Sequence, residues 1–279
     1  MSDAVNIGIL QDVTFIAGVM MFFGIIGYKL LRIARPSAAW NHEGQVLSRP
    51  YGDVDLLVAV AGMAVLLTGV MQPVAEIGVS AAARVVKAED VALGVVFQLL
   101  MCAVLLMYLS QFRHLNLPEI FGLESVRWRR ALLTVLAGML IIYLVVGGVA
   151  LVWMQWLEQM APGAEAQDLV KAFSESDSWS FRLLITLAAV VVAPVVEETL
   201  FRGFFYAVLK RYTDAPFAAV VTGLFFAIMH LHVGSLLPLW ALAMLLCAAY
   251  EFSGCLLVPI LLHAVFNGTS IVLMLIGVE

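Results

Sequence analysis

Residues 182–203 read RLLITLAAVVVAPVVEETLFRG, an apolar helix-length segment that carries Glu197, Glu198 and Arg202 near its end. A bilayer core about 30 Å thick needs roughly 20 apolar residues in a helix, so the segment predicts a transmembrane span. Charged groups at membrane depth cost several kcal/mol and are functional by default. The segment therefore predicts both the fold class and the place of a site.

Composition extends this prediction to the whole chain of 279 residues. Apolar residues make up 63% and charged residues 13%, against about 45–50% and about 25% in soluble domains. We therefore expect an all-α, polytopic membrane protein with the lipid bilayer as its solvent. The predicted spans number eight, at about residues 13–31, 54–72, 91–110, 131–154, 182–203, 216–234, 236–253 and 255–276.

Organisation and orientation follow from the polar segments between these spans. We expect residues 1–181 to form the first helices and an acidic outer loop with one short helix, and residues 182–279 to carry the chemistry. The inner loops hold nine Lys and Arg and the outer loops four if the N-terminus lies outside, which the positive-inside rule favours. This predicts an N-out, multi-pass protein, as in a bacterial inner membrane. An odd number of spans would move only the C-terminus.

The net charge of −5 and the cysteines exclude some classes of protein. No basic cluster is suited to nucleic acid. Cys102, Cys247 and Cys255 lie at irregular spacing in apolar segments, which argues against a disulfide framework and against a CxxC metal site.

The two glutamates of the 182–203 segment are expected to differ in role. Glu198 and Arg202 are four positions apart, with the acid first, so they can form an ion pair along the helix. Glu197 points about 100° away and has no local partner. A poorly solvated carboxylate of this kind suits general-base work on a water molecule. Pro194 predicts a kink just before the pair.

Two further clusters carry histidines. His230 follows Phe226 by one helical turn. His263 and Asn267 are also four apart, so both project from one helix face, and two convergent donors are what an oxyanion hole requires. Alone, each cluster has a structural explanation, such as a buried hydrogen-bonded histidine or interhelical bonding. Together, they form a complete set for hydrolysis by water, because Thr199 and Ser270 have no evident activating base.

The three clusters, EExxxR at 197–202, FxxxH at 226–230 and HxxxN at 263–267, resemble the hallmarks of the type II CAAX prenyl endopeptidases, the CPBP intramembrane proteases. The resemblance implies a helical membrane endopeptidase acting on a peptide or protein tail, with lipidated tails among the expected substrates. Eukaryotic members remove the last three residues of prenylated proteins, and bacterial members are often linked to peptide processing or self-immunity.

The resemblance also assigns roles to the residues. Glu197 and His230 would activate water, His263 and Asn267 would stabilise the oxyanion, and Glu198 and Arg202 would support them. We favour a metal-free mechanism, since Asn267 suits a donor role better than zinc ligation; zinc bound by Glu197, His230 and His263 is the alternative.

Two other functions remain open from the sequence. A proton-coupled transporter also uses intramembrane acids and histidines, and a non-catalytic family member could act as a scaffold or confer immunity. Two residues of one site should lie at a similar depth in the membrane. The predicted spans instead place Glu197 and His230 roughly 10 Å apart in depth. A kink at Pro194, or a helix continued to Lys210, would reconcile them.

Overall fold

The computed structural model describes residues 26–34, 44–77, 86–124, 126–160 and 168–276. These residues form helices and connecting turns without a β-strand, which confirms the all-α fold class. Before the site region lie a helical segment at 26–34, α2 (Asp53–Ile77), α3 (Ala88–Met107), the π turn η1 (Tyr108–Phe112), α4 (Leu117–Ile120) and α5 (Trp128–Met160). The site region begins with α6 (Asp168–Glu175) and α7 (Trp179–Leu187) and continues with η2 (Ala188–Val192), α8 (Ala193–Glu198), η3 (Thr199–Tyr206) and α9 (Ala207–Tyr212). The last helices are α10 (Ala215–Ile228), α11 (Val233–Ser253) and α12 (Leu257–Leu275).

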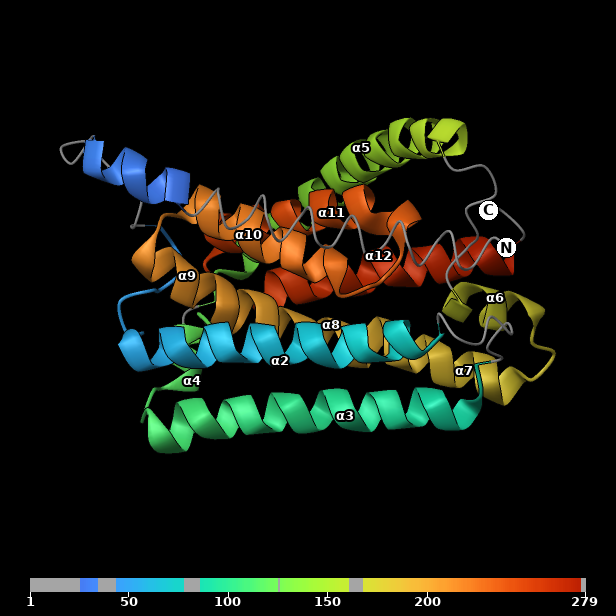
Figure 1. Ribbon diagram of the computed structural model, residues 1–279, viewed down its shortest axis with the longest axis horizontal. Helices are drawn as coiled ribbons and strands as arrows, with labels where there is room; N and C mark the ends of the chain where they lie inside the picture. Colours follow the sequence, from blue (N-terminus) through green and yellow to red (C-terminus); the bar gives the residue numbers. More distant parts are fainter. Residues whose placement is uncertain (1–25, 35–43, 78–85, 125, 161–167, 277–279) are drawn as a thin grey trace.

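The helices run roughly side by side along the long axis of the molecule (Figure 1). The helix formed by α7 to α9 lies between α2 and α3 on one side and α10 to α12 on the other. α11 packs against both α5 and α10, and α12 packs against η2, α8 and α5. The elements that hold the three motif clusters therefore meet inside the bundle.

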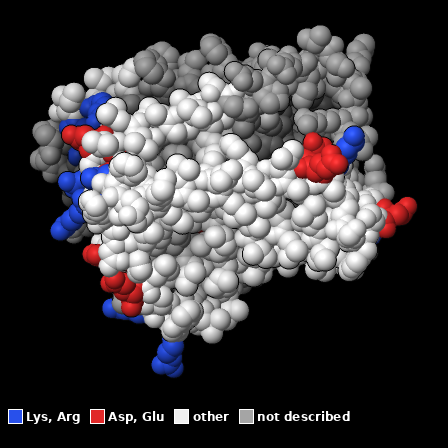
Figure 2. Space-filling model, turned by 90° about the horizontal axis from the view of Figure 1, so that it is seen from below, with Lys and Arg blue, Asp and Glu red and all other residues white. Residues whose placement is uncertain are grey.

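Charge and exposure show that the molecule is an integral membrane protein. On the face that Figure 2 shows, charged residues gather at the two ends and leave an uncharged band between them. α5 exposes many large apolar side chains, among them Leu132, Leu136, Leu140, Leu144 and Leu151. Such exposure is costly in water but is expected of a helix surrounded by lipid.

The number of spans is only partly settled by the helices. Among the described residues, five helices are long and apolar enough to cross a membrane, at Ala88–Phe112, Trp128–Gln159, Trp179–Tyr212, Val233–Ser253 and Leu257–Leu275. The predicted span 13–31 lies mostly outside the described residues. The count of eight is therefore not confirmed.

The predicted span 216–234 was wrong at its C-terminal end. α10 stops at Ile228 after 14 residues, fewer than the roughly 20 that cross a bilayer. Leu231 then adopts a left-handed φ of 49°, and the His232 side chain accepts a hydrogen bond from Ser235 N as the N-cap of α11. An apolar sequence hides this turn, because none of its residues is glycine or proline.

The structure also agrees with the sequence predictions for a short helix before residue 182, for the length of the glutamate helix and for the cysteines. The polar segment before residue 182 contains the short helix α6, although α5 extends further into it than predicted. The helix that carries the glutamates continues without a break from Trp179 to Tyr212, past Lys210. The three cysteines are buried and free.

Candidate active site

The helix that carries the two glutamates is irregular on both sides of them. α8 holds Glu197 and Glu198 in its last two positions, between the π turns η2 and η3. Single π turns inside helices occur often at functional sites. The sequence indicated an irregularity only through Pro194, which lies in the first turn of α8.

Glu198 is buried and accepts two hydrogen bonds on one oxygen. Its Oε1 lies 2.8 Å from Arg202 Nη1 and 2.8 Å from His263 Nδ1, so it joins the helix to α12. An ionised carboxylate only accepts hydrogen bonds, so His263 Nδ1 carries the hydrogen. The predicted pair with Arg202 is confirmed, and the bond to His263 is a contact that helix spacing alone did not show.

Arg202 is also buried, and both terminal nitrogens of its guanidinium have hydrogen-bond partners. Nη2 donates to the Ala243 backbone oxygen of α11 at 3.3 Å. The guanidinium carbon lies 4.7 Å from the centre of the Phe226 ring of α10, within the range of a cation–π interaction. One arginine thus connects the glutamate helix to two other helices.

Glu197 has surroundings unlike those of its neighbour. Its side chain is 19% exposed, and its Oε2 lies 4.0 Å from His263 Nε2, beyond hydrogen-bond distance. Among the described residues, Glu197 Oε2 and Glu198 Oε2 are buried oxygens without a hydrogen-bond partner. Because Arg202 and His263 hold Glu198 through its other oxygen, Glu197 is the carboxylate of the pair that no hydrogen bond among the described residues holds in place.

His230 is joined to this group through Phe226. Its Nδ1 lies 2.8 Å from the Phe226 backbone oxygen, and a carbonyl only accepts, so Nε2 is the free nitrogen. The Phe226 ring centre lies 4.7 Å from that of His230 and 5.9 Å from that of His263. Phe226 is the central contact of the site, a role that its spacing to His230 did not reveal.

Asn267 lies one turn beyond His263 on α12, and its Nδ2 donates to the Ala189 backbone oxygen of η2 at 2.8 Å. The amide has a second N–H, which the recorded contact does not use. The structure thus brings together five predicted residues, Glu197, Glu198, Arg202, His230 and His263, by direct contact or through Phe226. Asn267, on α12, instead contacts the preceding part of the glutamate helix at Ala189.

The other polar residues near the clusters have structural partners. Thr199 Oγ1 donates to Val195 O at 2.7 Å, and Ser270 Oγ donates to Phe266 O at 3.0 Å. His232 caps α11. None of these side chains is arranged as a nucleophile with an adjacent base.

A zinc site requires three or four closely grouped ligands. In the part of the chain that the structure describes, no three His, Cys, Asp or Glu side chains are grouped closely enough to hold a metal ion. Glu198 bonds His263 Nδ1, which leaves His263 Nε2 facing Glu197.

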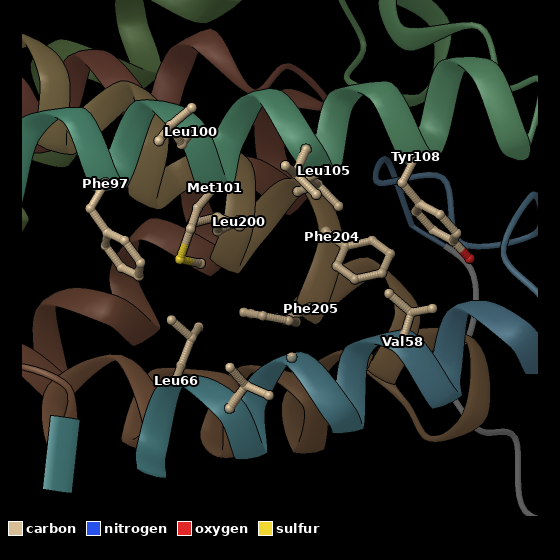
Figure 3. Close-up of a pocket in the computed structure, with 13 residues that line it drawn as sticks. Val58, Leu66, Phe97, Leu100, Met101, Leu105, Tyr108, Leu200, Phe204 and Phe205 are labelled. Carbon is tan, nitrogen blue, oxygen red and sulfur yellow. The ribbon is translucent and has the colours of Figure 1, made fainter. Parts of the chain in front are cut away.

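An apolar cavity of about 860 Å³ lies beside the glutamate helix, between α2, α3 and η3 (Figure 3). Leu200, Phe204 and Phe205 of η3 face side chains such as Leu66 of α2 and Phe97 of α3 across it. Tyr108 at one end supplies the only hydroxyl among the lining residues. The next residue along the helix, Tyr206, does not line the cavity; it is buried, and its hydroxyl donates to Glu251 Oε1.

Comparison with known protein families identifies the segment that holds these clusters. Residues 178–269 match the Rce1-like family, type II CAAX prenyl endopeptidase Rce1-like. The match includes all three motif clusters and confirms the resemblance. No curated protein and no solved structure matches the chain.

Proposed function

We propose that this protein is an intramembrane endopeptidase that hydrolyses a peptide bond with a water activated by Glu197 and His230. The observation that carries the proposal is that the two adjacent glutamates differ in their hydrogen-bond partners. Both carboxylates have a buried Oε2 without a hydrogen-bond partner among the described residues, but Glu198 is held through Oε1 by Arg202 and His263, whereas no such bond holds Glu197. A family match to CAAX endopeptidases gives this geometry its reaction class.

In this mechanism Glu197 takes the proton of the attacking water, and His230 Nε2 orients that water. His263 and the free N–H of Asn267 donate to the oxygen on which negative charge develops, as an oxyanion hole does. For that role His263 must donate through Nε2 as well as Nδ1, which makes it an imidazolium in the reacting state.

We further propose that no metal takes part and that the N-terminus lies outside the membrane. Asn267, whose amide suits a donor role better than zinc ligation, supports the first, and the distribution of Lys and Arg supports the second. The substrate is a peptide or protein tail that reaches the site from the lipid phase, without a part for nucleic acid.

The test uses purified protein in lipid vesicles treated with a metal chelator. We expect cleavage of a reporter peptide with a C-terminal lipidated cysteine, and no peptide-independent proton flux when a pH gradient is applied. A transporter would give flux without hydrolysis. A scaffold or immunity protein would give neither, and its phenotype in cells would survive alanine at Glu197 and His230. Cleavage lost with the chelator and regained with zinc would contradict the metal-free mechanism.

The cavity supports a lipidated substrate, because Leu200 on its wall lies one helical turn after Glu197. A side chain at Gly62 of α2 tests this. The position of its Cβ lies 3.6 Å from the Phe205 ring, an ordinary contact, so Gly62→Ala fits while Gly62→Phe fills the cavity. We expect Gly62→Phe to raise KM for the lipidated peptide by at least about 10-fold, since each buried CH₂ contributes about 0.8 kcal/mol.

The unlipidated form of the same peptide is the internal control, and Gly62→Ala is the matched variant. Both variants should cleave the unlipidated peptide at the wild-type rate. An equal loss with both peptides would show that Gly62→Phe disturbs the helix packing, and an unchanged KM would remove the cavity from substrate binding.

A further inference from the structure

The bond between Asn267 and Ala189 has a specific origin in the backbone of the glutamate helix. In an α-helix the Ala189 carbonyl would accept from the N–H of residue 193. Here Ala193 N–H donates to Ala188 O, one residue further back, because the chain makes a π turn. The next donor along the π turn would be residue 194, which is a proline and has no N–H. Neither of the two backbone donors that a helix offers can therefore reach Ala189 O.

Asn267 supplies the missing donor from a different helix. Its Nδ2 lies 2.8 Å from Ala189 O, and an unpaired carbonyl away from water is costly enough that it is normally paired. α12 lies directly against η2 at this point, where the Cβ position of Gly268 is 3.7 Å from Val190. The contact is thus a polar bond within a packed interface.

We propose that Pro194 makes Asn267 a positioning residue, whose amide docks α12 onto the glutamate helix and so sets the gap between His263 and Glu197. His263 is one turn before Asn267 on the same face of α12, and Glu197 is two turns after Ala189. The bond fixes one helix against the other at Ala189, and the facing atoms His263 Nε2 and Glu197 Oε2 are 4.0 Å apart. The effect on catalysis rests on the function proposed above, while the docking itself does not.

The docking role and the oxyanion role use different hydrogens of the same amide, so they can be separated. Replacing Pro194 by alanine returns an N–H that can bond Ala189 O within the helix. That change removes the need for docking but leaves the need for an oxyanion donor. The two roles therefore predict different results for the double variant Pro194→Ala with Asn267→Ala.

The first measurement is the melting temperature of the purified variants in detergent. We expect Asn267→Ala to lower it by about 2–4 °C, the shift given by one net hydrogen bond in a chain of this size. Asn267→Asp keeps the shape without the N–H and should be at least as harmful. In protein that already carries Pro194→Ala, Asn267→Ala should lower the melting temperature by less than half as much as it does in otherwise wild-type protein. Pro238→Ala, at a proline inside α11, is the matched control and should leave the loss unchanged.

The second measurement is peptide cleavage. Asn267→Ala should lower kcat with little change in KM, and adding Pro194→Ala should restore part of kcat, although the protein then carries two changes. The remaining deficit measures the oxyanion role. If no variant and no wild-type protein cleaves a peptide, the proposed function fails while the melting temperatures still decide the docking.

Two outcomes would overturn the proposal. One is a wild-type melting temperature for Asn267→Asp, since the docking bond would then contribute nothing. The other is a drop in melting temperature from Asn267→Ala that is equally large in the wild-type and the Pro194→Ala protein. Pro194→Val restores the same N–H and replaces Pro194→Ala if that variant does not fold.

Discussion

Glu197→Gln is expected to lower kcat for peptide cleavage by about 10²–10⁴-fold, the usual contribution of a general base. Glutamine has nearly the same shape as glutamate but does not take up a proton at neutral pH. The change leaves the bonds of Glu198 to Arg202 and His263 in place. We therefore expect KM and the melting temperature to change little, and the loss to fall on the chemical step.

The matched control is Glu124→Gln, which neutralises an exposed carboxylate whose recorded partner is Asn116, away from the site. It should cleave at the wild-type rate. The measurement is steady-state cleavage of the lipidated reporter peptide, followed by mass spectrometry of the product ends. Unchanged kcat in Glu197→Gln would remove this residue from the mechanism. A loss accompanied by a lower melting temperature would instead indicate a structural role.

Side-chain spacing predicted the local parts of this site correctly. The Glu198–Arg202 pair and the shared face of His263 and Asn267 depend on contacts within one helix, which 3.6 residues per turn determines. The apolar content also predicted the membrane-spanning fold. These features need no knowledge of how the helices pack.

The contacts between helices could not be predicted in this way. Glu198 accepts from His263, which is 65 positions away, and the ring of Phe226 packs beneath Arg202. Both depend on where α10 and α12 cross the glutamate helix. The left-handed Leu231 and the π turns were also hidden, because their residues have no turn signature, and Pro194 indicated a kink without its form. Spacing therefore finds candidates for chemistry, while their roles come from the partners that packing gives them.

Arg202→Met is expected to have the largest effect on stability of any single change at the site. It removes the positive charge that faces Glu198, whose side chain is fully buried. Breaking a buried ion pair by removing one partner costs about 3–5 kcal/mol, because the other charge stays uncompensated. The change also removes the hydrogen bond to Ala243 O and the contact with Phe226. The packing of the glutamate helix against α10 and α11 is therefore weakened as well.

The double variant Arg202→Met with Glu198→Gln separates the charge from the packing. Neutralising Glu198 removes the uncompensated charge, while the glutamine oxygen still accepts from His263 Nδ1. If the buried charge dominates, the double variant should be more stable than Arg202→Met alone, as measured by thermal unfolding in detergent. If the two are equally unstable, the lost contacts of the guanidinium dominate. A variant Arg202→Met as stable as wild type would contradict this prediction, because Glu198 would then lose its buried counter-charge without a cost in stability.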